Sequence, residues 1–301
     1  MNVLITGGAG FIGSHIVDLF IKNKHNVTII DNLFSGKKKN INPKAIFIQK
    51  DILDNLDGIF KKGNFDVIIH NAALVDANES ISKPKIYEKV NLKGTINLLE
   101  HCRKFDVKKF IYASSNAIYG NPKYLPCDEK HPKNPVNPYG DAKLKAENKI
   151  IDYSNKYGIG YIILRYGNVY GPRQDPIKGG VIVKFLNRIA NNKELIVFGD
   201  GTQTRDFLFV EDAALSNILA LETKNKIFNI ASGTQTSINE LLEEIKKLFN
   251  KKIKIKHLKA LKEIKYTYLD ITLAEKQLHW QPKTELSEGI KKTYQNHNDN
   301  K

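Results

Sequence analysis

The sequence predicts an α/β fold built on a doubly wound parallel sheet, with a smaller α/β lobe at the C-terminal end. Short apolar segments alternate with segments of helical spacing through the first half of the chain. The short segments are continuously apolar rather than alternating, which is typical of parallel strands covered by helices on both faces. A glycine-rich turn follows the first of them, in the place where such sheets bind ligands.

The predicted strands follow one another along the first half of the chain. Segments with strand character are Val3–Ile5, Asn26–Ile30, Ala45–Gln49, Val67–His70, Lys109–Ala113 and Gly160–Leu164. Helical spacing separates most of them, as at Ser14–Lys22 and Tyr139–Tyr153. Past residue 171 a Gly- and Pro-rich stretch begins, and a strand-like Ile227–Ile230 is expected to return to the sheet. We therefore predict a sheet domain over residues 1–171 and a second lobe over residues 172–301.

The composition argues against several classes of protein. The chain has 301 residues, of which 41% are hydrophobic and 26% charged, as in globular domains. Its net charge of +15 is carried by scattered lysines without interleaved aromatic side chains, so we expect no nucleic-acid partner. No apolar stretch is long enough to cross a bilayer, which predicts a cytoplasmic protein with no membrane partner. Cys102 and Cys127 lack metal-ligand spacing, so no metal site is expected.

The glycine turn has the context that a dinucleotide site requires. Gly7, Gly10 and Gly13 follow a predicted strand and open a predicted helix. Glycines allow a tight turn and let the backbone approach a pyrophosphate at the helix N-terminus, as in a Rossmann-type fold. Asp31 ends the next predicted strand, where a carboxylate accepts hydrogen bonds from a ribose and repels a 2′-phosphate. The sequence therefore predicts NAD rather than NADP, although Lys37–Lys39 leave tolerance of a phosphate open.

A tyrosine and a lysine supply candidate proton-transfer chemistry. The spacing YxxxK occurs twice, at Tyr139–Lys143 and Tyr119–Lys123, and by itself it has no predictive value. Gly120 and Pro122 break the second match, whereas Tyr139 opens a predicted helix, so that only Tyr139 and Lys143 share a helix face. Ser115 ends a predicted strand, at the edge where a doubly wound sheet binds its ligand.

These three side chains can act together in proton transfer. A phenol with a pKa near ~10 is a poor base at neutral pH, but a neighbouring ammonium and a positively charged nicotinamide favour its anion. Tyr139 could then remove a hydroxyl proton. Lys143 would hold the nicotinamide ribose, and Ser115 would position or relay the proton.

With these motifs the chain resembles the extended short-chain dehydrogenase/reductase family, and within it the NAD-dependent epimerases and dehydratases, most closely UDP-glucose 4-epimerases. The resemblance runs nearly end to end, through TGGAGFIGSH, DNLFSG, HNAA, NLKGTINLL, SSNAIYG, YGDAK, LRYGNVYGPRQ, FGDGTQTRDF and LHWQPK. It implies an isomerase that oxidises sugar C4 by hydride transfer to NAD, rotates the 4-keto intermediate, and returns the hydride to the other face.

The resemblance also implies site residues. For the cofactor these are Gly7, Gly10, Phe11, Ile12, Gly13, Asp31, Asn32, Ser35, Gly36, Asp51, Ile52, Ala72, Ala73, Asn91, Ser115, Tyr139 and Lys143. For the sugar nucleotide, held mainly by the second lobe, they are Ser115, Tyr139, Asn168, Val181, Arg205 and Thr267. Arg205 is implied to bind the diphosphate, for which a planar guanidinium is well suited. The resemblance further implies a homodimer formed through helices near Tyr87–Lys104 and Tyr139–Tyr157.

Three positions bear on the choice among related activities. Related dehydratases and decarboxylases carry acids just after the catalytic hydroxyl residue, whereas Asn116, Ala117 and Ile118 follow Ser115 here, which favours epimerisation. The family's late diphosphate arginine is missing from Ala260-Leu261-Lys262-Glu263, and Lys259 or Lys262 is its possible substitute. Thr267 stands where epimerases restricted to plain hexoses carry a bulky tyrosine, so N-acetylated sugars are expected to fit as well.

Other functions stay open at this stage. A uronate 4-epimerase, a C4 reductase or a dehydratase of the same family would use the same cofactor. A non-catalytic, epimerase-like protein that binds nucleic acid would account for the positive charge, but it would need a phosphate-tracking patch rather than the Ser115, Tyr139 and Lys143 side chains.

Overall fold

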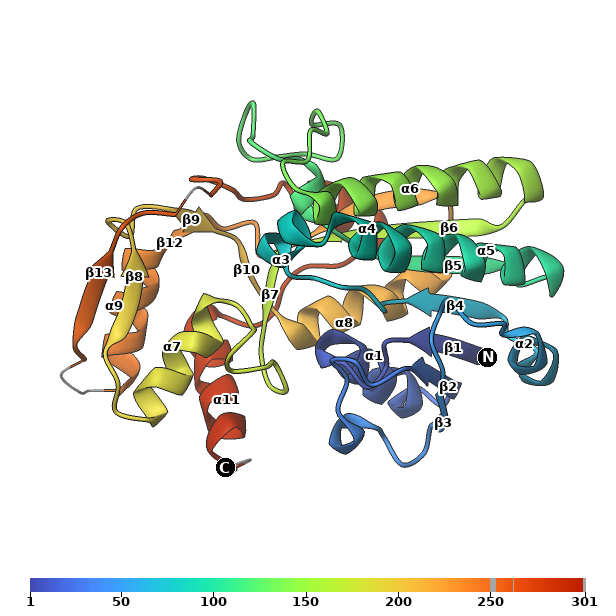
Figure 1. The fold of residues 1–301 in the computed structure, drawn as a ribbon, viewed down its shortest axis with the longest axis horizontal. Helices are drawn as coiled ribbons and strands as arrows, with labels where there is room; N and C mark the ends of the chain where they lie inside the picture. Colours follow the sequence, from blue (N-terminus) through green and yellow to red (C-terminus); the bar gives the residue numbers. More distant parts are fainter. Residues whose placement is uncertain (250–252, 262, 300–301) are drawn as a thin grey trace.

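The computed structural model describes residues 1–249, 253–261 and 263–299. A seven-stranded sheet with helices on both faces forms the larger lobe, and a smaller lobe stands at its side (Figure 1). The strand order is β11-β6-β5-β4-β1-β2-β3, and every neighbouring pair is parallel. The predicted fold class is therefore confirmed.

The strands of the sheet are close to the predicted segments. They are β1 Asn2–Thr6, β2 Asn26–Asp31, β3 Ile46–Gln49, β4 Val67–His70, β5 Lys109–Ser115, β6 Gly160–Tyr166 and β11 Lys226–Ile230. Two of them continue beyond the predicted ends at Ala113 and Leu164, because the pairing of Ser114 with Arg165 extends β5 and β6. This extension is polar, so an apolar pattern could not mark it.

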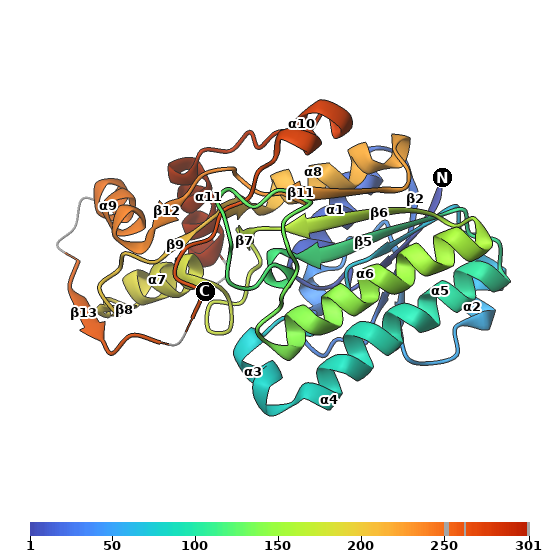
Figure 2. The same cartoon turned by 90° about the horizontal axis from the view of Figure 1, so that it is seen from above.

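Helices cover both faces of this sheet (Figure 2). On one face lie α1 Phe11–Lys22 and α8 Val210–Leu219, with α10 Thr272–Leu278 near the edge strand. On the other lie α5 Gly94–Lys104 and α6 Pro138–Tyr157, with α2 Asp57–Gly63, α3 Ala77–Ser82 and α4 Pro84–Tyr87. A π-helical segment, Glu88–Lys93, joins α4 to α5, and short 3-10 turns occupy Lys38–Asn40, Asn116–Ile118 and Ala220–Glu222.

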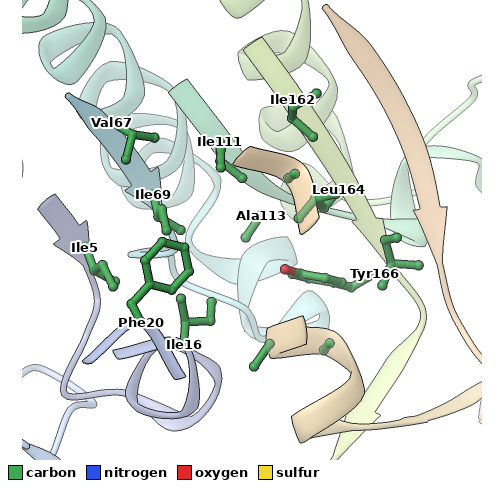
Figure 3. Close-up of a cluster of buried hydrophobic side chains, with 14 of the residues drawn as sticks. Ile5, Ile16, Phe20, Val67, Ile69, Ile111, Ala113, Ile162, Leu164 and Tyr166 are labelled. Carbon is green, nitrogen blue, oxygen red and sulfur yellow. The ribbon is translucent and has the colours of Figure 1, made fainter. Parts of the chain in front are cut away.

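Alternate residues of each strand enter two separate apolar cores. Val3 and Ile5 of β1 pack with Phe20 of α1 in one core, which also contains Ile69 and Ile111 (Figure 3). Leu4, between them in sequence, packs in the core on the opposite face. Burial on both faces explains the continuously apolar strands. It also fixes the register of each strand, since a one-residue slip would exchange the two faces.

The smaller lobe has an apolar core of its own. Its elements are α7 Val181–Ala190, the parallel pair β8 Leu195–Phe198 and β13 Ile255–Leu258, α9 Ile238–Phe249 and α11 Leu286–Asp299. The described parts of α7, β8, α9 and α11 meet around Phe185, Leu195, Leu241 and Ile290.

Two further short strand pairs lie outside the large sheet. They are β7 Asn168–Tyr170 with β10 Phe207–Phe209, and β9 Thr204–Arg205 with β12 Thr236–Ser237. Immediately after β10 the chain enters α8, which packs against α1, and β11 then pairs with β6. Residues of both chain halves thus build the larger lobe, and the division at residue 171 stays a prediction. None of the helices formed by the described residues is long and apolar enough to span a membrane.

Candidate active site

The glycine turn closes against the neighbouring strand end at the point where the strand order reverses. Gly7 has φ +71°, and a Cβ there would stand 2.8 Å from the Ala72 backbone. A Cβ on Gly13 would stand 2.1 Å from the Gly7 carbonyl oxygen. Both positions therefore exclude any other residue. The turn is as close-packed as pyrophosphate binding requires, so the residues present fit a dinucleotide.

The helix that follows this turn presents free amides. Gly10 is the N-cap of α1 and makes no side-chain cap hydrogen bond, and the first turn of the helix has no acidic residue. Free N–H groups and the positive end of the helix dipole favour an anion at this place.

Asp31 lies at the end of β2 beside the same turn. Its carboxylate accepts hydrogen bonds from the Ala9 amide at 3.1 Å and the Leu33 amide at 2.8 Å. Burial raises the pKa of Asp31, and these two backbone bonds act in the opposite direction. A Cβ on Gly36 would come within 2.8 Å of the carboxylate, so the loop after β2 must also pass close by.

A second loop, at the end of β4, is held by a buried histidine. Thr95 donates to the Asn91 carbonyl at 2.7 Å, so its oxygen accepts from His70 Nε2 at 2.9 Å. This assigns the Nε2–H tautomer to His70, whose Nδ1 then accepts from Thr6 at 2.8 Å. The Thr6 oxygen in turn accepts from the Ala72 amide at 3.2 Å. Burial lowers the pKa of His70 to about 3, so the imidazole is neutral.

The remaining predicted cofactor residues surround these two loops. The Asn91 amide group exchanges two hydrogen bonds with the Leu74 backbone, just past Ala72 and Ala73. Asn32 donates to Asp51 at 2.7 Å. Ile52 packs where a Cβ on Gly94 would touch it. Phe11 and Ile12 are partly buried, and Ser35 is exposed. Their predicted contacts with a cofactor remain a proposal.

Ser115, Tyr139 and Lys143 come together at the seam between β5 and α6. The Asn137 side chain caps α6 by accepting from the Gly140 amide, and Pro138 occupies the first turn, so the helix starts at the predicted place. The Ser115 hydroxyl lies near enough to Tyr139 to lower the pKa of its phenol. Lys143 is only 3% exposed and donates to the Ala113 carbonyl at 2.7 Å.

Burial dominates the electrostatics of this trio. It raises the pKa of Tyr139, while the nearby Ser115 hydroxyl acts the other way. It lowers the pKa of Lys143 to about 7, while the Glu147 carboxylate opposes that shift. The Lys143 ammonium also stands 4.7 Å from the centroid of the Tyr112 ring. The protein alone therefore shifts both groups toward their neutral forms, against the simple expectation from the YxxxK spacing.

The residues predicted to hold a sugar nucleotide lie on several segments. Arg205 donates to the Thr204 and Ile264 carbonyls and forms an ion pair with Glu263. Thr267 lies along the same segment, with its amide 3.3 Å from the Thr204 hydroxyl. The Asn168 amide donates to the Asp206 carbonyl at 2.8 Å, next to Arg205. These three are thus brought together.

Within the part of the chain that the structure describes, no hydrogen bond or ion pair joins Val181 or Lys259 to these three residues. Val181 starts α7 and packs against the core of the smaller lobe. Lys259 is exposed. Lys262, the other possible substitute for the missing arginine, lies outside the described residues.

Sequence reasoning missed the partners that hold these groups. It did not single out Ser114 or Glu147, nor did it anticipate that Glu263 would pair with Arg205. The position of Glu147, four residues after Lys143 on a predicted helix, was an available signal. Glu263 had none, because 58 residues separate it from Arg205.

Comparison with known proteins adds to this geometry. The sequence profile described as "NAD dependent epimerase/dehydratase family" matches residues 3–231. A Methanocaldococcus jannaschii protein, provisionally named UDP-glucose 4-epimerase, is 49% identical over 96% of both chains. The solved UDP-glucose 4-epimerase of Thermotoga maritima with UDP-glucose is 39% identical, with a TM-score of 0.96, and the match covers 100% of this chain and 99% of that one.

A solved relative whose name gives a different substrate matches almost as well. It is the UDP-N-acetylglucosamine 4-epimerase of Methanobrevibacter ruminantium in complex with UDP-N-acetylmuramic acid. It is 35% identical, with a TM-score of 0.95, and the match covers 100% of this chain and 99% of that one.

The close packing of the glycine turn generates one prediction. Gly13→Ala should weaken NAD binding by at least about tenfold, or about 1.4 kcal/mol, because the new Cβ meets the Gly7 carbonyl. Titration calorimetry on protein with a folded circular dichroism spectrum measures this. The matched control is Gly58→Ala, where a Cβ would have nothing within 4 Å. Wild-type affinity in Gly13→Ala would contradict the assigned turn.

The buried lysine generates a second prediction. With a folded pKa of about 7, Lys143 binds fewer protons in the folded than in the unfolded state above that pH. Wild-type stability should therefore rise relative to Lys143→Met above pH 7, with a slope that approaches about 1.4 kcal/mol per pH unit between about pH 8 and 9.5. Urea unfolding of both proteins across this range measures the difference. A pH-independent difference would show that Lys143 keeps an ordinary pKa.

Proposed function

The chain belongs to the NAD dependent epimerase/dehydratase family, and on this premise we propose that it interconverts the C4 epimers of a UDP-sugar, with UDP-glucose and UDP-galactose as its first substrate pair. The observation that carries this proposal is the placement of Tyr139 near Ser115 and of Lys143 on the Ala113 carbonyl, at the sheet edge that also carries the glycine turn. The names of relatives that act on UDP-glucose support it.

NAD is the cofactor of this family. When bound, NAD accepts a hydride from a sugar carbon and gives it back. The Gly7–Gly13 turn and the α1 N-terminus would hold the pyrophosphate, because both offer close backbone and free amides. Asp31 would accept hydrogen bonds from the ribose hydroxyls, because its carboxylate oxygens have further lone pairs besides those used by the two backbone amides.

Tyr139 is proposed as the base that takes the proton from the sugar 4-hydroxyl and later returns it. Burial raises its pKa, so ionisation depends on neighbours that favour the phenolate. Ser115 is such a neighbour, since its hydroxyl already acts to lower the pKa of Tyr139. The Lys143 ammonium, fixed to the Ala113 carbonyl, is the other, and a cationic nicotinamide ring would add to it.

The residues after Ser115 favour epimerisation over elimination. Asn116–Ile118 form a short 3-10 turn, and the Ser115 hydroxyl accepts from the Ala117 amide at 3.1 Å. This turn has no carboxyl group that could protonate a leaving hydroxyl. A C4 reductase would consume added NADH stoichiometrically, whereas the proposed reaction has no net redox change.

Thr267 supports a substrate range that includes N-acetylated sugars. Its side chain is small, and it lies next to Thr204 and Arg205, the proposed diphosphate ligand. One well-matched solved relative carries an N-acetylglucosamine epimerase name. We therefore extend the proposal to the UDP-GlcNAc and UDP-GalNAc pair. A uronate 4-epimerase is the second candidate, and UDP-glucuronate belongs in the same assays.

The assembly and location complete the proposal. Two copies would pair through the outer faces of α5 and α6, where Tyr157 is 40% exposed. A cytoplasmic location fits a substrate made and used inside the cell. Neither a nucleic-acid nor a membrane partner forms part of this function.

Removal of the proposed base tests the catalytic assignment. Tyr139→Phe should lower kcat for UDP-galactose by about 10²- to 10⁴-fold, because no group at that position could then take the proton. Proton NMR of the anomeric region measures product, and an enzymatic assay of the cofactor extracted from the protein measures retained NAD. Tyr157→Phe is the matched control, since its exposed ring lies away from the trio. Near-normal turnover in Tyr139→Phe, with NAD bound, would exclude it as the base.

Enlarging residue 267 tests the substrate range. Thr267→Tyr should abolish turnover of UDP-GlcNAc and leave UDP-glucose turnover within about threefold, because the ring would fill the space beside the sugar 2-substituent. Competition between the two substrates in one NMR assay gives the ratio directly. Thr267→Ser is the control and should keep both activities. If the wild type converts UDP-glucose but not UDP-GlcNAc, the extension to N-acetylated sugars is wrong.

A further inference from the structure

A charged pair is buried directly behind the trio. The Arg165 and Glu147 side chains are 1% and 2% exposed. Arg165 donates from Nη2 to Glu147 Oε2 at 2.7 Å and from Nε to Oε1 at 3.1 Å. Ser114 donates a third hydrogen bond to the same carboxylate, at 2.5 Å. A buried pair of this kind stabilises a fold no better than apolar side chains of the same volume. Its presence therefore calls for another explanation.

The pair, together with Ser114, connects α6 and β5, which carry the trio, to the neighbouring strand β6. Glu147 is on α6, Ser114 on β5 and Arg165 on β6. Two polar bonds fix α6 to the end of β5: Lys143 to the Ala113 carbonyl, and Ser114 to Glu147. They involve consecutive residues of the strand and side chains one helical turn apart, so together they set the helix against the strand.

The Arg165 guanidinium nitrogen that does not bond Glu147, Nη1, also has hydrogen-bond partners. Arg165 Nη1 donates to the Tyr119 hydroxyl and to the Glu129 carbonyl, each at 3.0 Å. Tyr119 donates to Asn229 of β11 at 2.6 Å. The guanidinium therefore cannot leave Glu147 without breaking several buried hydrogen bonds, and the carboxylate keeps one position.

We propose that Glu147, held by Ser114 and Arg165, is a positioning residue that keeps the Lys143 ammonium charged and in register with Ser115 and Tyr139. The proposal rests on the proposed function for the role of the trio in catalysis. Glu147 acts through Lys143 and need not touch the substrate. The contact that carries the proposal is the hydrogen bond from the Ser114 hydroxyl to the Glu147 carboxylate. It is not part of the ion pair with Arg165, and it connects that pair to the residue next to Ser115.

The charges around Lys143 support this assignment. Of the groups that face it, His70 on β4 is neutral, Tyr112 on β5 presents its ring, and Tyr139 precedes it on α6. Glu147 is the anion among them, and it opposes the fall in the pKa of Lys143 that burial causes. Without that anion the ammonium would be lost at lower pH, and the phenolate of Tyr139 would lose its support.

A charge-free replacement separates this role from a structural one. Glu147→Leu/Arg165→Met removes both charges at similar volume, so a merely structural pair should be replaced without loss. We expect a folded protein that binds NAD, a kcat at least about tenfold lower, and an alkaline limb of the kcat profile about one pH unit lower. The titration of Lys143, followed by its ¹³Cε chemical shift, should move in the same direction.

A smaller change tests the same point without disturbing the charges. Ser114→Ala removes only the hydroxyl, and it should lower kcat severalfold while KM and NAD affinity stay within about twofold. Ser216→Ala is the matched control, because that buried hydroxyl also makes a short bond, to the Ala213 carbonyl, in α8. Ser114→Thr keeps the hydroxyl and should restore turnover.

The outcomes are distinct. Wild-type kcat and an unchanged Lys143 titration in both variants would overturn the positioning role. If the double variant does not fold, the kcat of Ser114→Ala decides whether Glu147 has a positioning role. A wild type that converts no UDP-sugar would count against the proposed function, and the Lys143 titration would still test the link to Glu147.

Discussion

The Lys143 ammonium is buried between β5 and α6, and much of the site is arranged around the cost of keeping a charge there. Burial lowers the pKa of Lys143 to about 7 even though the Glu147 carboxylate opposes that shift. The Ala113 carbonyl, the Tyr112 ring and the Glu147 carboxylate offset part of that cost. Because the pKa of Lys143 is near neutral pH, any further charge in this buried site would change the fraction of Lys143 that is protonated. A bound charged cofactor would have this effect directly.

The same packing explains how the two ligand regions meet. Parallel strands place their carboxyl ends at one edge, so the glycine turn after β1, the loop after β4 and Ser115 at the end of β5 all face one side. The chain then leaves the sheet through β7 and returns through β10, which puts Asn168 and Arg205 on adjoining segments. A sugar nucleotide bound there would reach from Arg205 toward Tyr139.

Sequence patterns could predict those features that depend on residues close together in the chain. The strand positions followed from continuous apolar segments, and the start of α6 from Asn137 and Pro138. The glycine positions followed from the turn, which tolerates no Cβ at Gly13. The pairing of Arg165 with Glu147 and of Arg205 with Glu263 could not be predicted, because a single sequence does not show which distant charges share a buried space. Burial also reversed the simple pKa expectation for Tyr139.

The central claim is that this site oxidises a sugar carbon and returns the same hydride. The most direct measurement is the fate of deuterium in UDP-glucose labelled at C4, incubated with the NAD-loaded protein and analysed by NMR and mass spectrometry. The account predicts UDP-galactose that keeps the deuterium at C4, with no net formation of NADH. Loss of the label to solvent, or the absence of any C4 epimer with NAD bound, would contradict it.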